Sequence, residues 1–146
     1  MTSYEKRTWW STHRLTERLK AATFLEAAVS SAFVIAAADG NASEQEYDAL
    51  LDRLEILGGI ERDTIDEQFT AASNEIEANG FEPRIARIGE LVSGEDSATA
   101  VLMLAIAVAL ADDDVSAQER EVIGQLASGL GIGNANIDAL IAEIRG

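Results

Sequence analysis

The chain has 146 residues, a net charge of −15 at pH 7 and no cysteine. This length is sufficient for one domain that buries about two-thirds of the surface of the unfolded chain, so folding requires neither a disulfide nor a structural metal. The lack of cysteine excludes thiol chemistry and agrees with a reducing cytoplasm. The acidic surplus argues against DNA or RNA binding, because carboxylates repel phosphates, and it favours cations or basic proteins as partners.

Residues 1–20 differ from the rest of the chain because they carry more basic than acidic side chains. They contain no apolar run of the signal-peptide type, so we expect a cytoplasmic protein, with peripheral attachment at the inner membrane face as an option. A helix is predicted over 4–20. Its tryptophan and arginine side chains suit contact with a partner or an anionic membrane. These candidate contact residues are Trp9, Trp10, Arg14 and Arg18.

The competing interpretation of this segment is that it packs on the main domain, and the irregular spacing of its apolar residues favours that interpretation. His13, the single histidine, is interpreted as a solvated side chain. We divide the chain into a basic and aromatic N-terminal helix or tail, 1–20, and a helical domain, 21–146.

Two apolar stretches, 21–38 and 98–111, are predicted as the buried central helices of the domain. Each falls short of the roughly 20 strongly apolar residues that a membrane-spanning helix needs. Apolar residues at helical spacing predict further, amphipathic helices. These are expected over 43–57 and 63–78, from Glu82 with Pro83 in the first turn, over 116–130, and over 137–144 after a cap at Asn134 or Asn136. No segment alternates with period two, so the predicted fold is all-α, a single-domain bundle of about seven or eight helices.

Each buried helix leads into a similar turn. The motif Ala38-Asp39-Gly40 with Ser43-x-x-Glu46 reappears as Ala111-Asp112-Asp113 with Ser116-x-x-Glu119. In both copies the Ser-x-x-Glu pattern predicts a capping box at the start of the next helix. The repetition indicates that the domain is built from a duplicated helix-loop-helix unit.

The two turns place acidic side chains after helix C-termini, where the partial negative charge of the helix disfavours them. If the two units pack about a pseudo-twofold axis, the turns face each other, and a divalent cation with oxygen ligands would relieve the repulsion. The predicted metal ligands are Asp39, Glu46, Asp112 and Glu119, with Asn41 and Asp114 as additional candidates.

This arrangement is not an EF-hand, because Leu50 and Ile123 stand where the bidentate glutamate of that loop belongs. The competing interpretation is purely structural. Aspartate, asparagine, glycine and serine are ordinary turn and cap residues, and both glutamates already have a capping role.

The paired motifs, the alanine-rich second central helix and Leu130-Gly131-Ile132 resemble the tellurite-resistance TerB family over roughly residues 20–133. The wider superfamily includes co-chaperone DjlA-like domains. The resemblance implies a duplicated helical bundle in a cytoplasmic bacterial protein of the tellurium-resistance and stress-response systems. It also implies divalent-metal binding at the four acidic positions named above, and protein partners of the tellurium-resistance system that include membrane-associated ones. Asp113 departs from the family pattern, which usually has glycine there, and makes the second turn more acidic.

The expected function is that of a non-enzymatic adaptor that binds a divalent cation and docks on a protein or membrane-associated partner. Calcium is the favoured cation, ahead of magnesium, manganese and zinc. The alternative is a metal-free helical scaffold whose acidic residues only cap helices and keep the protein soluble. An enzyme ranks third, because the chain has one histidine and no recognisable nucleophile or cofactor loop, so no catalytic residue is predicted.

Overall fold

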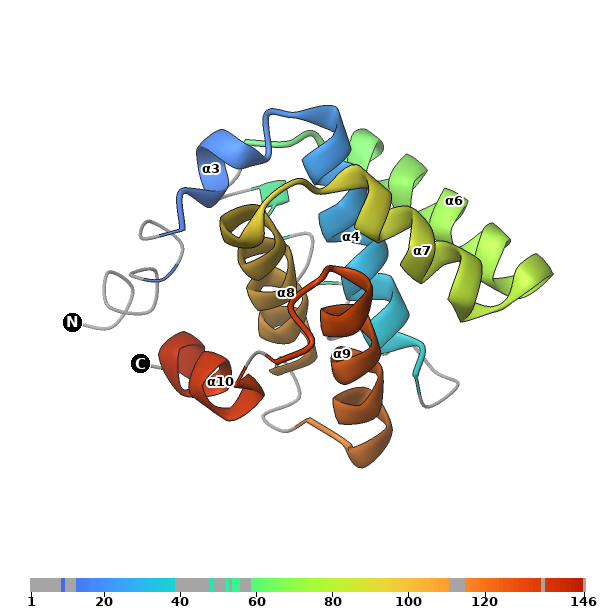
Figure 1. The fold of residues 1–146 in the computed structure, drawn as a ribbon. Coiled ribbons are helices and arrows are strands. Elements are labelled where there is room, and N and C mark those ends of the chain that lie inside the picture. Colours follow the sequence, from blue (N-terminus) through green and yellow to red (C-terminus); the bar gives the residue numbers. More distant parts are fainter. Residues whose placement is uncertain are drawn as a thin grey trace.

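A computed structural model describes Trp9, residues 13–38, Asp48, Asp52, Leu54, Glu55, and residues 59–110, 115–134 and 136–145. The regular secondary-structure elements in this part of the chain are all helices, so the predicted all-α bundle is confirmed (Figure 1). They are α3 (Leu15–Arg18), α4 (Ala22–Ala36), α6 (Arg62–Asn79), α7 (Phe81–Leu91), α8 (Glu95–Ala109), α9 (Ala117–Gly129) and α10 (Ile137–Arg145).

The helices α4 and α8 form the centre of the fold and pack against each other. Most of their side chains are buried on every side, from Phe24 to Ala36 in α4 and from Ala98 to Ala109 in α8. Alanine occupies many of these positions, which allows two helices to approach closely. The predicted buried central pair is confirmed. No helix in the described ranges is long and apolar enough to cross a bilayer.

The remaining helices cover this central pair. Helices α6, α7 and α9 pack on α4, while α9 and α10 pack on α8. A perpendicular contact between the rings of Phe33 and Phe69, with centroids 4.6 Å apart, joins α4 to α6. Gly80, with φ +84°, connects α6 to α7. The helices predicted over 63–78 and after Glu82 are confirmed, with observed bounds that differ by one residue at the ends that were specified.

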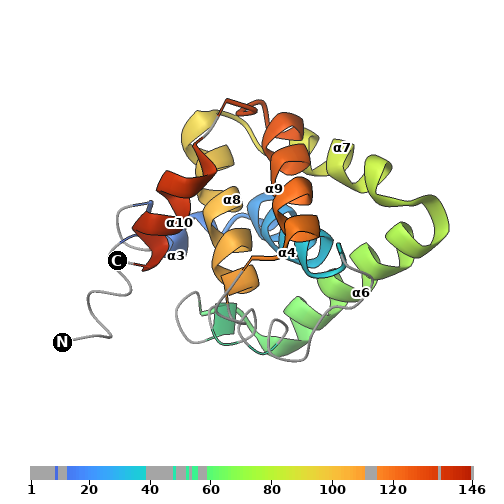
Figure 2. The same cartoon turned by 90° about the horizontal axis from the view of Figure 1, so that it is seen from below.

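The two central helices run in the same general direction. In Figure 1 both helices run downward from their N-terminal ends. Figure 2 shows the molecule from below, which is the side of their C-terminal ends. Their C-terminal ends therefore lie at the same end of the molecule.

Helix α9 begins and ends with well-defined caps. At its start Ser116 Oγ accepts from Glu119 N at 3.1 Å, and Ser116 N donates to Glu119 Oε1 at 2.9 Å, which confirms the second capping box. At its end Ile132 N donates to Ala127 O at 2.8 Å and Gly131 adopts φ +81°. This is a Schellman motif, in which a residue in the left-handed conformation turns the chain so that backbone N–H groups donate to the last carbonyls of the helix. The last helix starts at a confirmed cap, because Asn136 Oδ1 accepts from Ala139 N at 3.1 Å.

The first unit of the duplication ends differently from the second. Leu54 and Ala127 are separated by the same number of residues as Ser43 and Ser116, so they are equivalent positions. Leu54 O accepts from Ile60 N, six residues later, whereas Ala127 O accepts from Ile132 N, five residues later. The first unit therefore contains one extra residue before its left-handed glycine, Gly59. The first capping box, Ser43 with Glu46, lies outside the described residues.

The predicted helix over 4–20 is wrong as a continuous element. Arg14 adopts φ 54°, a left-handed conformation that interrupts a helix, and α3 extends only from Leu15 to Arg18. Trp9, Leu15 and Leu19 are buried in the same hydrophobic core as the central helices. This packing agrees with the interpretation that the segment lies on the main domain.

Candidate functional site

The two acidic turns follow α4 and α8, whose C-terminal ends lie at the same end of the molecule (Figure 2). Most of the predicted ligands, namely Asp39, Asn41, Glu46, Asp112 and Asp114, lie outside the described residues. The convergence of their carboxylates stays a prediction.

Glu119 is the predicted ligand that the structure describes. It is only 5% exposed, and its carboxylate is fixed at the start of α9 by the hydrogen bond from Ser116 N. The first turn of a helix favours a negative charge because the backbone N–H groups there are unpaired. This hydrogen bond uses Oε1, and a carboxylate has about four lone-pair sites, so capping does not by itself prevent cation binding. Within the described residues, no group of three or more metal-binding side chains is found.

The candidate contact residues of the N-terminal segment lie in different environments. Trp9 is 4% exposed, so its indole packs in the core and presents little surface to a partner. Arg18 is half-buried and donates to His13 O at 2.8 Å and to Ser97 Oγ at 2.6 Å. Arg14 is exposed, with Nε 3.9 Å from Glu17 Oε2. Trp10 lies outside the described residues.

His13 is not simply a solvated side chain, and that interpretation is wrong. Its Nε2 lies 3.0 Å from Glu143 Oε2, and its side chain is only 22% exposed. This contact joins the N-terminal segment to α10, the last helix of the domain.

The sequence interpretation missed a cluster of ion pairs that joins α4, α6 and α7. Arg84 is 7% exposed, and its Nε lies 2.6 Å from Glu75 Oε1. Its Nη1 lies 3.4 Å from Glu26 Oε2 and 3.3 Å from Ser30 Oγ. Arg87 Nε lies 3.1 Å from the same oxygen of Glu26, and this hydrogen bond and the charge of Glu26 raise the pKa of Arg87.

This cluster contains two arginines and two glutamates, so its charges balance, and we assign it a structural role. A signal for it was present in the sequence. Glu26 and Ser30 are one helical turn apart within an otherwise apolar stretch, and a charge on a buried helix requires a partner.

A comparison of the sequence with protein-family models gives a match that covers both duplicated turns and the helices around them. A family model described as Tellurite resistance protein TerB matches residues 25–142, from α4 into α10. The chain belongs to the TerB family. The TerB resemblance inferred from the paired motifs is therefore confirmed, and the TerB match includes both acidic turns. Neither the curated proteins nor the solved structures gave a significant match.

Proposed function

We propose that this TerB-family chain is a non-enzymatic adaptor of the tellurite-resistance and stress response. It binds a divalent cation at its acidic turns and docks on a protein or membrane-associated partner. The observation that supports this proposal is the position of Glu119. Its buried carboxylate is fixed immediately after the second acidic turn, at the start of the helix that follows.

The cation is held by oxygen ligands from both turns. Asp39, Glu46, Asp112 and Glu119 supply carboxylates, and Asn41 and Asp114 complete the ligand set. Calcium is the favoured ion because it takes six to eight oxygen ligands in flexible geometry, whereas magnesium needs a stricter octahedron. Manganese and zinc are the other candidates. A bound cation neutralises like charges and fixes the conformation of both turns, which in turn forms the surface that a partner contacts.

The test measures metal binding by calorimetry and thermal unfolding with calcium, magnesium, manganese or zinc, against a chelator. A ligand at 100 times its dissociation constant adds about 2.7 kcal/mol, which raises the melting temperature of a chain of this size by several degrees. Glu119→Gln is the decisive variant, because glutamine preserves the capping box but removes the charge. We expect it to abolish the metal-induced shift and to lower the metal-free melting temperature by no more than a few degrees, since only the charge at the first turn is lost.

Glu77→Gln is the matched control, because Glu77 is exposed on α6, a different helix. It should retain the full response to metal. If the wild-type protein responds to none of the four cations, the metal-binding part of the proposal is wrong.

The alternative function, a metal-free scaffold, is favoured by the same capping box, which explains Glu119 without any ion. It predicts that the double variant Asp39→Asn with Asp112→Asn binds its partner normally and is more stable than the wild type, since charge repulsion is reduced. The cation-dependent adaptor predicts the loss of calcium binding and of calcium-dependent partner binding in the same variant.

Peripheral docking at the inner membrane face is the membrane part of the proposal. It relies on Trp10 and on Arg14, whose side chain is 71% exposed. Sedimentation with phosphatidylglycerol vesicles checks it. We expect Arg14→Glu to reduce the bound fraction several-fold, and equal sedimentation of both proteins would contradict a membrane role for this segment.

A further inference from the structure

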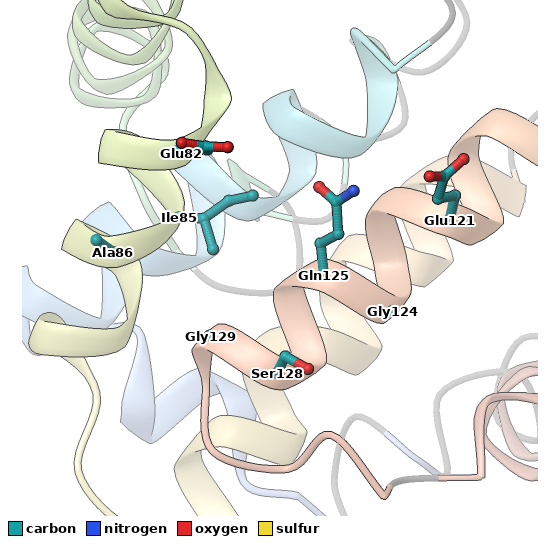
Figure 3. Close-up of a pocket in the computed structure, with 8 residues that line it drawn as sticks. All are labelled: Glu82, Ile85, Ala86, Glu121, Gly124, Gln125, Ser128 and Gly129. Atoms are coloured by element: carbon teal, nitrogen blue, oxygen red, sulfur yellow. The ribbon is translucent and has the colours of Figure 1, made fainter.

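Helices α7 and α9 touch at one end and diverge toward the other. A Cβ atom added to Gly89 would lie only 2.4 Å from Gly129 O, so the two backbones are in direct contact there. A Cβ atom added to Gly124, earlier in α9, would meet no atom within 4 Å. The divergence leaves an open groove of about 700 Å³ between the two helices (Figure 3).

One face of each helix forms a wall of this α7–α9 groove. Ile85 points from α7 toward α9, and Gln125 rises from α9 on the opposite side (Figure 3). Ala86 and Gly124 also line the groove, and their small size allows an incoming chain to approach both backbones closely. The lining positions of each helix are three and four residues apart, as on one face of a helix.

Gly124 has no explanation within the chain itself. Gly89 and Gly129 are required by the close contact of α7 and α9, because a side chain at either position would collide with the other helix. Gly124 lies in the interior of α9, where glycine is less favourable than alanine, and a Cβ atom there would meet only open space. Glycine is expected where a ligand must approach the backbone, and this observation is independent of the size of the groove.

The rim of the groove is acidic. Glu82 and Glu121 are exposed, and they are the ionisable residues of its lining. In the described part of the chain neither has an ion-pair partner, whereas Arg84 and Arg120 are paired with carboxylates of their own chain. The first turn of α7 favours an acid at Glu82 through the helix dipole, but Glu121 lies beyond the first turn of α9. The groove thus presents two acids and no cation.

We propose that the α7–α9 groove binds a cationic amphipathic helix of a partner protein. Apolar side chains of that helix pack on Ile85 and Ala86, and its lysine or arginine side chains pair with Glu82 and Glu121. This is the helix-in-groove mode, in which apolar residues at helical spacing anchor a peptide. The proposal names the partner class for the adaptor described above and rests on that docking role. It does not need a cation at the acidic turns.

The test uses a fluorescent synthetic peptide of about 14 leucine and lysine residues, with the leucines on one helical face. Binding is measured by anisotropy in the presence of a chelator, and amide NMR shifts locate the peptide on the protein. We expect the largest shifts at Ile85, Gly124 and Gly129, which line the groove. Gly124→Leu adds a side chain to the groove at a position where its Cβ meets no atom within 4 Å, so we expect it to fold and to weaken binding at least tenfold.

Ala71→Leu is the matched control, because it adds leucine at an exposed position of α6, outside the groove. It should change the affinity less than twofold. The double variant Glu82→Gln with Glu121→Gln should weaken binding several-fold and reduce its dependence on salt, whereas Glu67→Gln with Glu77→Gln on α6 should not.

Three outcomes would overturn the proposal. The first is binding to Gly124→Leu at wild-type affinity. The second is a set of NMR shifts spread over the acidic surface, which would mean non-specific attraction. The third is a dimer in sedimentation that Gly124→Leu converts to a monomer, which would make the occupant a second copy of this chain. Because the chelator removes cations, failure here leaves the metal-binding part of the proposed function intact. Equally, if the wild-type protein binds none of the four metals, it can still bind the peptide, so the two proposals can fail separately.

Discussion

The contact between α7 and α9 makes a sharp prediction about two glycines that receive the same substitution. Gly→Ala in a helix interior stabilises the helix by about 0.5–1 kcal/mol. At Gly124 nothing opposes this gain, since the new Cβ meets no atom within 4 Å. At Gly89 the new Cβ would lie 2.4 Å from a backbone oxygen, so the helices must move apart. Overpacking of this kind costs about 1–3 kcal/mol.

The net expectation is a gain of about 0.5–1 kcal/mol for Gly124→Ala and a loss of up to about 2.5 kcal/mol for Gly89→Ala. For a chain of this size, 1 kcal/mol shifts the melting temperature by about 4 °C. Thermal unfolding followed by circular dichroism should therefore show a rise in melting temperature for the first variant and a fall of up to about 10 °C for the second. The effect of alanine on the unfolded chain is the same in both variants and cancels in the comparison. A rise of equal size in both would mean that α7 and α9 do not touch at Gly89.

Three further substitutions test features described above. Arg84→Met leaves Glu26 and Glu75 without their buried partner. Since both glutamates keep some exposure to water, we expect the free energy of unfolding, measured in urea, to fall by about 2–3 kcal/mol. A fall below about 0.5 kcal/mol would refute the buried cluster. Ser116→Ala removes the hydrogen-bond acceptor of the capping box and should cost about 1 kcal/mol by the same method, unless the cap does not form in solution. Gly131→Ala forces a left-handed conformation on alanine where no atom crowds it, so a loss of about 1–2 kcal/mol is expected, and no loss would argue against the Schellman motif.

The fold was largely predictable because its signals are local. Apolar runs gave the two central helices, helical spacing gave α6, α7 and α10, and the Ser-x-x-Glu pattern gave the cap at Ser116. The N-terminal helix was wrong because its break is conformational. Nothing in the local composition indicates that Arg14 adopts a left-handed conformation.

The contacts between distant residues were not predictable in the same way. Arg84 lies far from Glu26 in the sequence, and only the packing of α7 on α4 brings them together. The α7–α9 groove likewise depends on where two helices cross, which a single sequence does not state. For the acidic site, the sequence suggested candidate ligands that stay a prediction, and the structure describes one of these candidates, Glu119, in the capping role that its motif predicted.

The burial of Trp9, Leu15 and Leu19 affects how this protein should be produced for experiments. A fragment cut at the family match, 25–142, would lack Trp9, Leu15 and Leu19, which fill part of the core. Each large apolar side chain removed from a core forfeits about 1.5–3 kcal/mol of burial, which is a substantial share of the total stability of a domain. Such a fragment would expose apolar surface on the central helices and should aggregate when expressed. Laboratory fragments and fusions should therefore keep the segment that contains Trp9, Leu15 and Leu19 attached to the helical domain.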